Sequence, residues 1–320
     1  MKAFFPLLPL LFLFSCSNNT PTLPSSTGAI NEVVIVMDEY LWQGAAGDSI
    51  RATLGADVAG LAWQEPIFDL VQVPKKAFSR IFQTHRNVIL FEKTSKANVG
   101  HQLNMYSQAQ YYAEVTYTNT SELLELIHQY ADVLTHQIQK KEQARLQKRI
   151  ALAKELDGIY QKHGTYAPVP KRFSMVLDTT NFSWLEYSPK KNEIIEGVFI
   201  YTLPFETIFS TFPLLKARDS VLQLYVPGEL EGSYMATEAQ YSPWVRYEEG
   251  DSNVVLEIKS QWKMQNAFMG GPFVSKFLLD SASQSITVVE AFLFNPGKNK
   301  RDHMQQLQLI VDGAKKQISN

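Results

Sequence analysis

The sequence predicts an α+β fold with mainly antiparallel sheets, one long central helix and a C-terminal helix. Short runs rich in β-branched and aromatic residues follow one another across short turns, which favours antiparallel pairing. One stretch without glycine or proline, from Asn119 to Gly158, is typical of a helix set apart from the strands. The chain has 320 residues, of which 45% are hydrophobic, so it contains enough apolar material for a globular core.

The first fifteen residues predict a signal peptide. They combine the positive charge of Lys2 with an apolar run from Ala3 to Phe14 that is too short to span a membrane, which takes about 20 residues. The next residue, Cys16, completes a lipobox-like string Leu-Phe-Ser-Cys and is the only cysteine, so we expect lipid attachment at Cys16. The alternative is a plain signal peptide followed by a chance cysteine. A single cysteine excludes an intrachain disulfide.

Residues 16–28 are rich in Ser, Thr, Asn and Pro and predict a flexible tether. The remaining residues, 29–320, predict an α+β domain that is either one unit or two lobes, at about 29–165 and 166–320. The strands that we expect, from their apolar or alternating runs, cover residues 31–38, 65–74, 86–92, 111–118, 173–178, 182–187, 195–203, 254–262, 273–279 and 286–294. A short helix over 49–54 could be capped by Asp48.

The long helix has a start signal and an apolar stripe. Asn119, with Glu122 three residues later, resembles a capping box. The stripe weakens over Gln139–Gln143, where a bend is one alternative to a helix that crosses or projects from the molecule. Its members are Leu124, Ile127, Ala131, Leu134 and Ile138. The C-terminal helix is expected from about residue 300 to 318, with Met304, Leu307, Ile310, Val311 and Ala314 on one face.

The two halves of the chain share an order of elements. Residues 86–92 and 111–118 precede the long helix, and 273–279 and 286–294 precede the C-terminal helix. This strand–strand–helix order predicts either two related halves or a coincidence, because the order is common in α+β proteins.

The charge pattern excludes some partners. The chain carries 30 basic and 32 acidic residues, a net charge of −2, which argues against nucleic-acid binding. One helical stretch is basic and predicts a solvated face, with contact to lipid phosphates as the alternative. Its charged residues are Lys140, Lys141, Arg145, Lys148, Arg149 and Lys154 against Glu142.

Three potential metal ligands, His128, Asp132 and His136, follow at intervals of four residues. Three residues over two helical turns span about 12 Å, too far to bind one ion together. We therefore expect a solvated face, no metal and no cofactor.

The sequence lacks the Walker, GxGxxG, HExxH, GxSxG and CxxC motifs. A weaker convergence predicts a small polar-ligand site: a cation, two amphipathic aromatic residues and two glycines that allow close backbone approach. These residues are Arg218, Tyr234, Trp262, Gly270 and Gly271. In the competing interpretation, the glycines form a bulge and the aromatic residues belong to the core.

Several strings resemble a family of Bacteroidota lipoproteins known as domain of unknown function 4837. They include PSSTGAINEVVIVMD, WQGAAGDSIR, EPIFDL, RNVILFE, FSWLEY, GELEGSYM, MGGPFVS and NKRDHMQQLQLIV. The resemblance implies no activity, and Lys259-Ser260-Gln261 stands where the family pattern has an Arg-Gly pair.

We therefore expect a non-enzymatic cell-envelope lipoprotein that is held at the membrane by acylated Cys16 and binds an envelope protein or glycan. The uncharged residues after Cys16 lack the acidic surface-export signals of Bacteroidota lipoproteins, which favours the periplasmic side. The alternative is a hydrolase of an envelope polymer. Its candidate acids are Glu65, Asp219, Glu229 and Glu231, which would have to pair about 5–10 Å apart.

Overall fold

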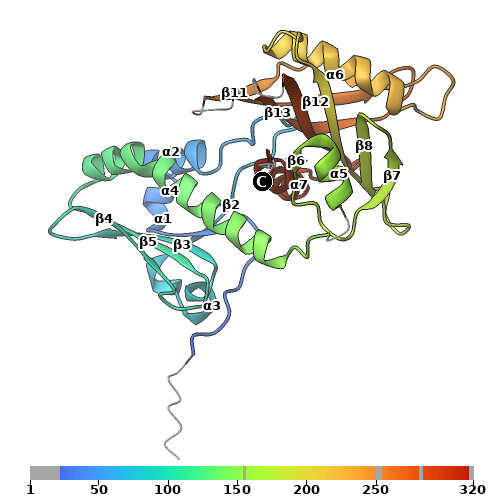
Figure 1. The fold of residues 1–320 in the computed structure, drawn as a ribbon. Helices are drawn as coiled ribbons and strands as arrows, with labels where there is room; N and C mark the ends of the chain where they lie inside the picture. The colour runs from blue at the N-terminus through green and yellow to red at the C-terminus, as the bar shows by residue number, and fades with distance from the viewer. Residues whose placement is uncertain (1–21, 154–155, 250–253, 281–283, 317–320) are drawn as a thin grey trace, which may run out of the picture.

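A computed structural model describes residues 22–153, 156–249, 254–280 and 284–316. The predicted signal peptide and Cys16 lie outside this range. The described chain builds two sheets, one from each half of the sequence, with a long helix beside the junction (Figure 1). None of the described helices is both long enough and apolar enough to cross a membrane.

The smaller sheet has five strands, in the order β2-β1-β3-β5-β4. Pairing is parallel throughout except between β4 and β5, so this sheet departs from the predicted antiparallel arrangement. Its central strands are buried on both faces, which is typical of parallel sheets. The strand bounds are β1 Glu32–Val36, β2 Asp69–Val73, β3 Asn87–Lys93, β4 Asn98–Leu103 and β5 Tyr111–Tyr117.

Helices cover both faces of the smaller sheet. On one face, α1 (Glu39–Trp42), α2 (Ala45–Thr53) and α4 (Thr120–Arg149) enclose a shared apolar core. On the other face lie the short 3-10 helix η1 (Lys75–Ala77) and α3 (Arg80–Gln83), with Phe78 and Phe82 against the sheet. Since α2 begins before Asp48, the predicted cap at that residue was wrong.

The long helix α4 begins as predicted. The Asn119 side chain accepts a hydrogen bond from the Glu122 amide at 3.1 Å, and the Glu122 carboxylate accepts one from the Thr118 amide at 2.7 Å. The helix ends at Arg149, well before Gly158. The residues buried along α4 are Leu123, Ile127, Ala131, Leu134, Ile138, Glu142 and Leu146, so Leu123 replaces the predicted Leu124.

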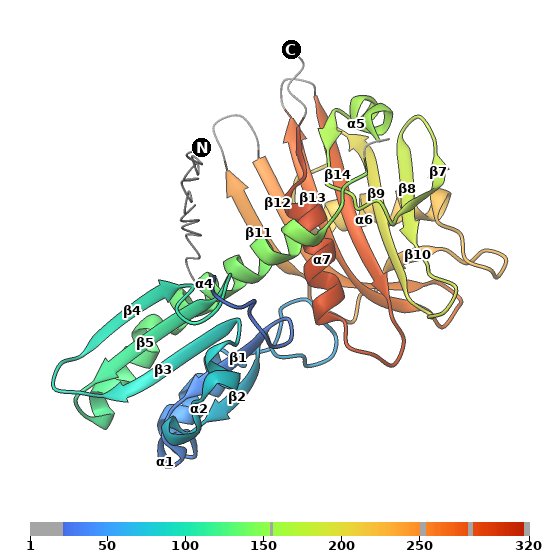
Figure 2. The same cartoon turned by 90° about the horizontal axis from the view of Figure 1, so that it is seen from below.

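The larger sheet has eight strands and is antiparallel, which confirms the predicted pairing for this half. Its path is β10-β12-β13-β14-β9-β8-β7, and β11 pairs with the other end of the same edge of β12 as β10 (Figure 2). The bounds are β7 Ser174–Asp178, β8 Phe182–Tyr187, β9 Ile195–Pro204, β10 Met235–Thr237, β11 Trp244–Glu249, β12 Val254–Met264, β13 Gly270–Asp280 and β14 Ser285–Phe294.

Three helices sandwich the larger sheet. One face packs on α5 (Asp157–His163) and α7 (Arg301–Asp312), and the other packs on α6 (Thr211–Tyr225). The helix α7 is shorter than predicted, because the chain turns after Asp312 and β15 (Lys315–Lys316) pairs with β6 (Thr165–Tyr166).

Of the two interpretations of the shared strand–strand–helix order, the strand pairing favours coincidence over two related halves. In the first half, β3 and β5 are parallel and are separated in sequence by β4. In the second half, β13 and β14 form an antiparallel hairpin. Parallel neighbours need a crossover and hairpin neighbours do not, so the two units cannot be copies of one motif.

The first half of the chain, from β1 to α4, is called the N-lobe, and the second half, from α5 to β15, is called the C-lobe. The two lobes meet at the first turn of α7. The Glu65 carboxylate accepts hydrogen bonds from the amides of Lys300 and Arg301 at 2.7–2.9 Å and caps this helix from the other lobe. The Arg301 side chain reaches back to Asp69 at 2.8 Å. Asn31 donates to Asp302 and Gln305. These contacts join the lobes, and Asn31, Arg301 and Gln305 also line the cleft that lies between them.

Candidate functional site

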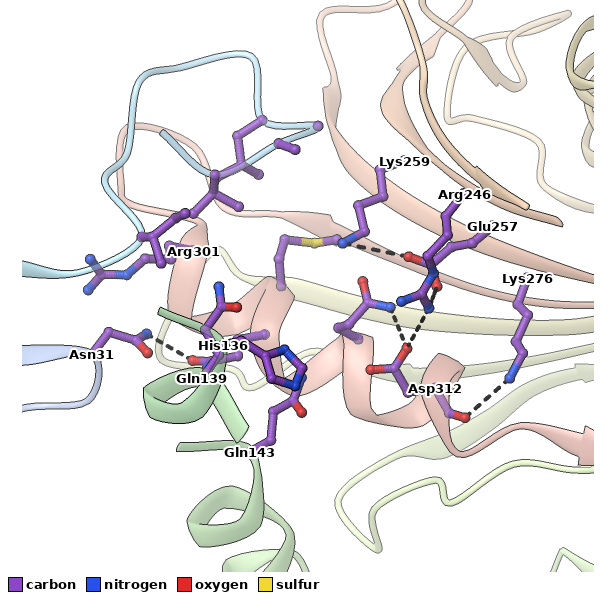
Figure 3. Close-up of a pocket in the computed structure, with 18 of the residues that line it drawn as sticks. Asn31, His136, Gln139, Gln143, Arg246, Glu257, Lys259, Lys276, Arg301 and Asp312 are labelled. Atoms are coloured by element: carbon purple, nitrogen blue, oxygen red, sulfur yellow. Dashed lines mark hydrogen bonds and ion pairs between the residues drawn. The ribbon is translucent and has the colours of Figure 1, made fainter. Parts of the chain in front are cut away.

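The cleft between the lobes has a volume of about 670 Å³ and is lined by residues from both (Figure 3). The N-lobe contributes residues 58–61 and one face of α4. The C-lobe contributes β11, β12, β13 and the exposed side of α7. Because each lobe supplies one wall, the cleft exists only in the assembled two-lobe molecule.

A charged network forms the C-lobe wall. The Glu257 carboxylate, whose side chain is only 2% exposed, binds Arg246 at 2.8 Å and lies 3.6 Å from the Lys259 ammonium. Arg246 also approaches Asp312 at 3.8 Å (Figure 3). The Lys259 ammonium lies 4.7 Å from the centre of the Trp244 ring, a cation–π contact. Strand pairing fixes this wall, because Trp244 is opposite Lys259 and Arg246 is opposite Glu257.

Lys276 fixes the end of α7 at the same wall. Its ammonium donates to the carbonyls of Asp312 at 3.2 Å and Ala314 at 2.8 Å. Burial lowers the pKa of Lys276 below its ordinary value, and the nearby carboxylates of Asp312 and Glu257 only partly offset that effect. These contacts assign Lys276 to holding the helix end in place.

The N-lobe wall of the cleft is formed by polar side chains that are free to bind a ligand. His136, Gln139 and Gln143 line the cleft from α4, on the face that points toward α7 (Figure 3). Within the part of the chain that the structure describes, none of these three side chains has a hydrogen bond to another protein group. The amides of Gln139 and Gln143 are therefore available to a ligand, each with donor and acceptor atoms.

The cleft carries a positive excess. Its lining includes five Lys or Arg residues against three carboxylates, whereas the whole chain has a net charge of −2. The cations are Lys140, Arg246, Lys259, Lys276 and Arg301, and the acids are Glu248, Glu257 and Asp312.

An open strand edge borders the cleft. Among the described residues β11 pairs with β12 alone, and every residue of β11 is exposed. Figure 2 shows β11 at the margin of the larger sheet, on the side that faces α4. Such an edge presents unpaired backbone amides and carbonyls to any extended chain that approaches it.

The structure places the predicted cation Arg218 inside the fold. Arg218 is 0% exposed and binds Glu290, also 0% exposed, through two hydrogen bonds of 2.8 and 2.7 Å. Burial opposes ionisation of Arg218, but Glu290 and Asp219 raise its pKa above the ordinary value. The guanidinium also stacks on Phe273 at 3.9 Å.

Three of the other four predicted residues lie beside one another. Trp262 is 2% exposed, pairs with Gly271 across the strands, and donates its indole N–H to the Leu293 carbonyl at 3.2 Å. A Cβ on Gly271 would lie 2.0 Å from that same carbonyl oxygen, and one on Gly270 would lie 2.8 Å from the Trp262 carbonyl oxygen. Both glycines therefore serve close strand packing.

Tyr234 lines a surface pocket beside α6, which it shares with Asp219. The ligand site predicted from these five residues stays a prediction. The packing of Arg218 and Trp262 favours the competing interpretation, in which they belong to the core.

The candidate acids of the hydrolase alternative have separate environments. Glu65 caps α7, and Asp219 accepts hydrogen bonds from Arg218 and from the amide and hydroxyl of Thr237. Glu229 and Glu231 are exposed in the loop after α6. Their positions give no pair of carboxylates across the cleft, since none of the four lines it.

The predicted helix ligands His128, Asp132 and His136 are exposed along α4. Across the described ranges, no group of three or more His, Cys, Asp or Glu side chains could hold a metal ion together. In the basic stretch of α4, Arg145 points inward and binds Glu142, which Arg86 and Asn87 also contact.

Two protein-family models match the chain, and they divide it near the boundary between the two lobes. A sequence model of the family described as "Domain of unknown function (DUF4837)" matches residues 153–313, half of the chain. The chain belongs to this family. A second model, "Domain of unknown function (DUF8532)", matches residues 26–151. The first four resembling strings, up to RNVILFE, lie in this second region except for the first two residues of the first string, so the DUF4837 match covers the C-lobe.

No curated protein matches the chain. Among solved structures, it is similar to LpqN of Mycobacterium tuberculosis, whose crystal structure is described as involved in cell envelope biogenesis. The two share 10% identity over 47% of this chain and 81% of that chain, with a TM-score of 0.26. At that score we draw no inference from the likeness.

Sequence reasoning missed most of the cleft. The weakening of the α4 stripe at Gln139–Gln143 was one usable signal, because Gln139 and Gln143 are the half-buried amides that line the cleft there. A second was the alternation of charged and apolar residues in β11 and β12, which places Arg246, Glu257 and Lys259 on one face. No local signal brings these two segments together.

Proposed function

We propose that this protein is a membrane-anchored binding module of the cell envelope, and that the cleft between its lobes holds the ligand. The anchor is the acylated Cys16, as in the Bacteroidota lipoproteins that the sequence resembles, and the folded part faces the periplasm. The cleft is the observation that carries the proposal. It has the volume of a ligand site, both lobes line it, and it offers α4 amides without internal partners.

The chemistry of the two walls suggests the ligand class. The positive excess favours a negatively charged ligand. The open edge of β11 favours an extended backbone that can add to the sheet as one more strand. Together they point to an extended acidic peptide segment of an envelope protein, with alternate side chains directed toward Lys259 and the α4 amides.

The environments of Glu65, Asp219, Glu229 and Glu231 support a binding role over the hydrolase alternative. A glycosidase of the usual kind needs two carboxyl groups that flank one bond. In the cleft, Glu257 and Asp312 are both engaged by Arg246.

A direct binding test uses the full chain and a fluorescein-labelled peptide of alternating threonine and glutamate. We expect the fluorescence anisotropy to rise with protein concentration, and the affinity to fall as salt is added. The same peptide with lysine in place of glutamate should not bind. Gln139→Ala combined with Gln143→Ala should weaken binding at least tenfold without lowering the melting temperature.

Gln147→Ala is the matched control, since Gln147 is an exposed amide on α4 outside the cleft. Equal binding by the double variant and the wild type would contradict the proposal. So would tighter binding of a neutral N-acetylglucosamine oligosaccharide than of the acidic peptide, because that result would assign the cleft to a glycan.

A further inference from the structure

The start of the described chain is fixed to one end of the N-lobe, although residues 16–28 were predicted to be a flexible tether. The Gln108 amide N–H donates to the Pro24 carbonyl at 2.8 Å, and the Gln108 side chain donates to the Leu23 carbonyl at 2.6 Å. Thr27 adds two backbone bonds of 2.9 Å, to Thr84 and Arg86. The chain therefore leaves the domain at a defined place, next to α3 (Figure 1).

Exposed apolar side chains gather at that place. Ile81 of α3 is 74% exposed, and Leu23 and Met105 are each 38% exposed. The loop that carries Met105 packs on the α3 segment, because the Gln110 side chain donates to the Gln83 carbonyl at 2.5 Å. The neighbouring Phe78 and Tyr106 rings make an edge-to-face contact at 6.2 Å.

Basic side chains accompany the apolar ones. Lys76 and Arg80 are exposed on η1 and α3, two residues before and two residues after Phe78. Neither has an ion-pair partner among the described residues, whereas the adjacent Lys75 is paired with Glu92. Apolar side chains together with unpaired cations are the composition of a surface that contacts an anionic membrane.

The short stretch of chain between Cys16 and Leu23 limits how far this surface can lie from the lipid anchor. Cys16 precedes Leu23 by seven residues, which span at most about 25 Å when fully extended. Acyl chains on Cys16 would therefore hold this end of the N-lobe close to the bilayer. In contrast, α6 lies at the far end of the molecule, across both lobes (Figure 1).

We propose that this end of the N-lobe rests on the membrane, with Leu23, Ile81 and Met105 in the interface and Lys76 and Arg80 on lipid phosphates. The occupant is the bilayer that carries the anchor, so the inference rests on the proposed attachment at Cys16. It adds an orientation, in which the N-lobe lies at the membrane and the C-lobe projects from it.

The test uses the acylated full chain in vesicles of phosphatidylethanolamine and phosphatidylglycerol. Acylation blocks the only native thiol, so a cysteine introduced as Ile81→Cys takes an environment-sensitive fluorophore at one position. Leu224→Cys on α6 is the matched control, since Leu224 is 75% exposed against 74% for Ile81. We expect a blue shift and quenching by nitroxide lipids at position 81, and water-like emission at position 224.

A charge variant checks the cations separately. Lys76→Glu with Arg80→Glu should reduce the blue shift at position 81, whereas Lys190→Glu with Lys191→Glu, an equal charge change at exposed C-lobe residues, should not. Water-like emission at position 81 in a chain that floats with the vesicles would overturn this orientation alone. A chain that does not float with them would contradict the anchor, and the orientation with it.

Discussion

Arg218 and Glu290 join α6 to the centre of the larger sheet by an ion pair with both side chains at 0% exposure. Glu290 also accepts a hydrogen bond from the Ser275 hydroxyl at 2.6 Å, so both oxygens of its carboxylate have hydrogen-bond partners. Removing one partner of such a pair leaves a buried charge without compensation, which costs about 3–5 kcal/mol.

We therefore expect Arg218→Met to lower the free energy of unfolding by about 3–5 kcal/mol, measured by urea denaturation. Arg80→Met, at an exposed arginine, should change it by less than about 0.5 kcal/mol. Adding Glu290→Gln to Arg218→Met should recover part of the loss. An Arg218→Met protein as stable as the wild type would show that the pair is not a structural element.

His163 makes a second residue-scale prediction, on pH. It is 5% exposed, its ring lies 2.9 Å from the Ser183 hydroxyl, and burial lowers its pKa to about 4. The unfolded chain binds a proton near pH 6.5 and the folded chain does not, so stability falls as the pH drops from 6.5 toward 4. The loss from this residue approaches about 3 kcal/mol.

His163→Gln should flatten that part of the stability–pH curve, measured by chemical denaturation at pH 7 and pH 4.5. His128→Gln, the same substitution at an exposed histidine of α4, is the matched control. If His163→Gln loses as much stability as the wild type between the two pH values, the histidine is protonated in the folded protein.

At the scale of elements, α7 depends on a cap from the other lobe. Its own N-cap residue, Lys300, makes no side-chain cap, and Glu65 takes that place. We expect Glu65→Ala to lower the free energy of unfolding by about 1–2 kcal/mol, the upper part of the range for a lost cap. Glu231→Ala, at an exposed acid, serves as the control in the same denaturation experiment, and an equal effect of both would refute the capping role.

The helix α4 gives a second prediction at this scale. Leu134 is 5% exposed in the N-lobe core, and the adjacent Val133 is 52% exposed. Leu134→Asp should cost more than about 3 kcal/mol, because it removes core packing and buries a charge. Val133→Asp tests the same chemistry on the solvent side and should cost less than about 1 kcal/mol. Thermal unfolding distinguishes the two, and similar melting temperatures would place the core on another face of α4.

The elements also show how far sequence reasoning reaches. The Asn119 cap and the strands β7, β8, β9, β12, β13 and β14 are local patterns, and the structure confirms them, whereas the short strand β10 and the exposed strand β11 were not predicted. The parallel pairing of β3 with β5 and the path of α6 depend on contacts between distant segments. The burial of Arg218 could not be predicted for the same reason, because its partner Glu290 lies 72 residues away in the sequence.

At the scale of the whole molecule, residues of both lobes line one cleft. Contacts of Glu65, Asn31 and Arg301 join the lobes, and residues of both α4 and β11 line the cleft between them. The lobes match different family models, so the cleft is a property of their combination. The membrane orientation proposed above would set α3 against the bilayer, with α6 at the opposite end.

Hydrogen–deuterium exchange of the full chain, with and without the acidic threonine–glutamate peptide, tests this account most directly. Addition of a strand to the open edge would pair backbone amides of β11 that now face solvent. We predict slower exchange over residues 244–249 and unchanged exchange in β7, an edge strand remote from the cleft. Protection confined to β7 or α6, or unchanged exchange in β11 at saturating peptide, would contradict the claim that the cleft binds an extended acidic chain.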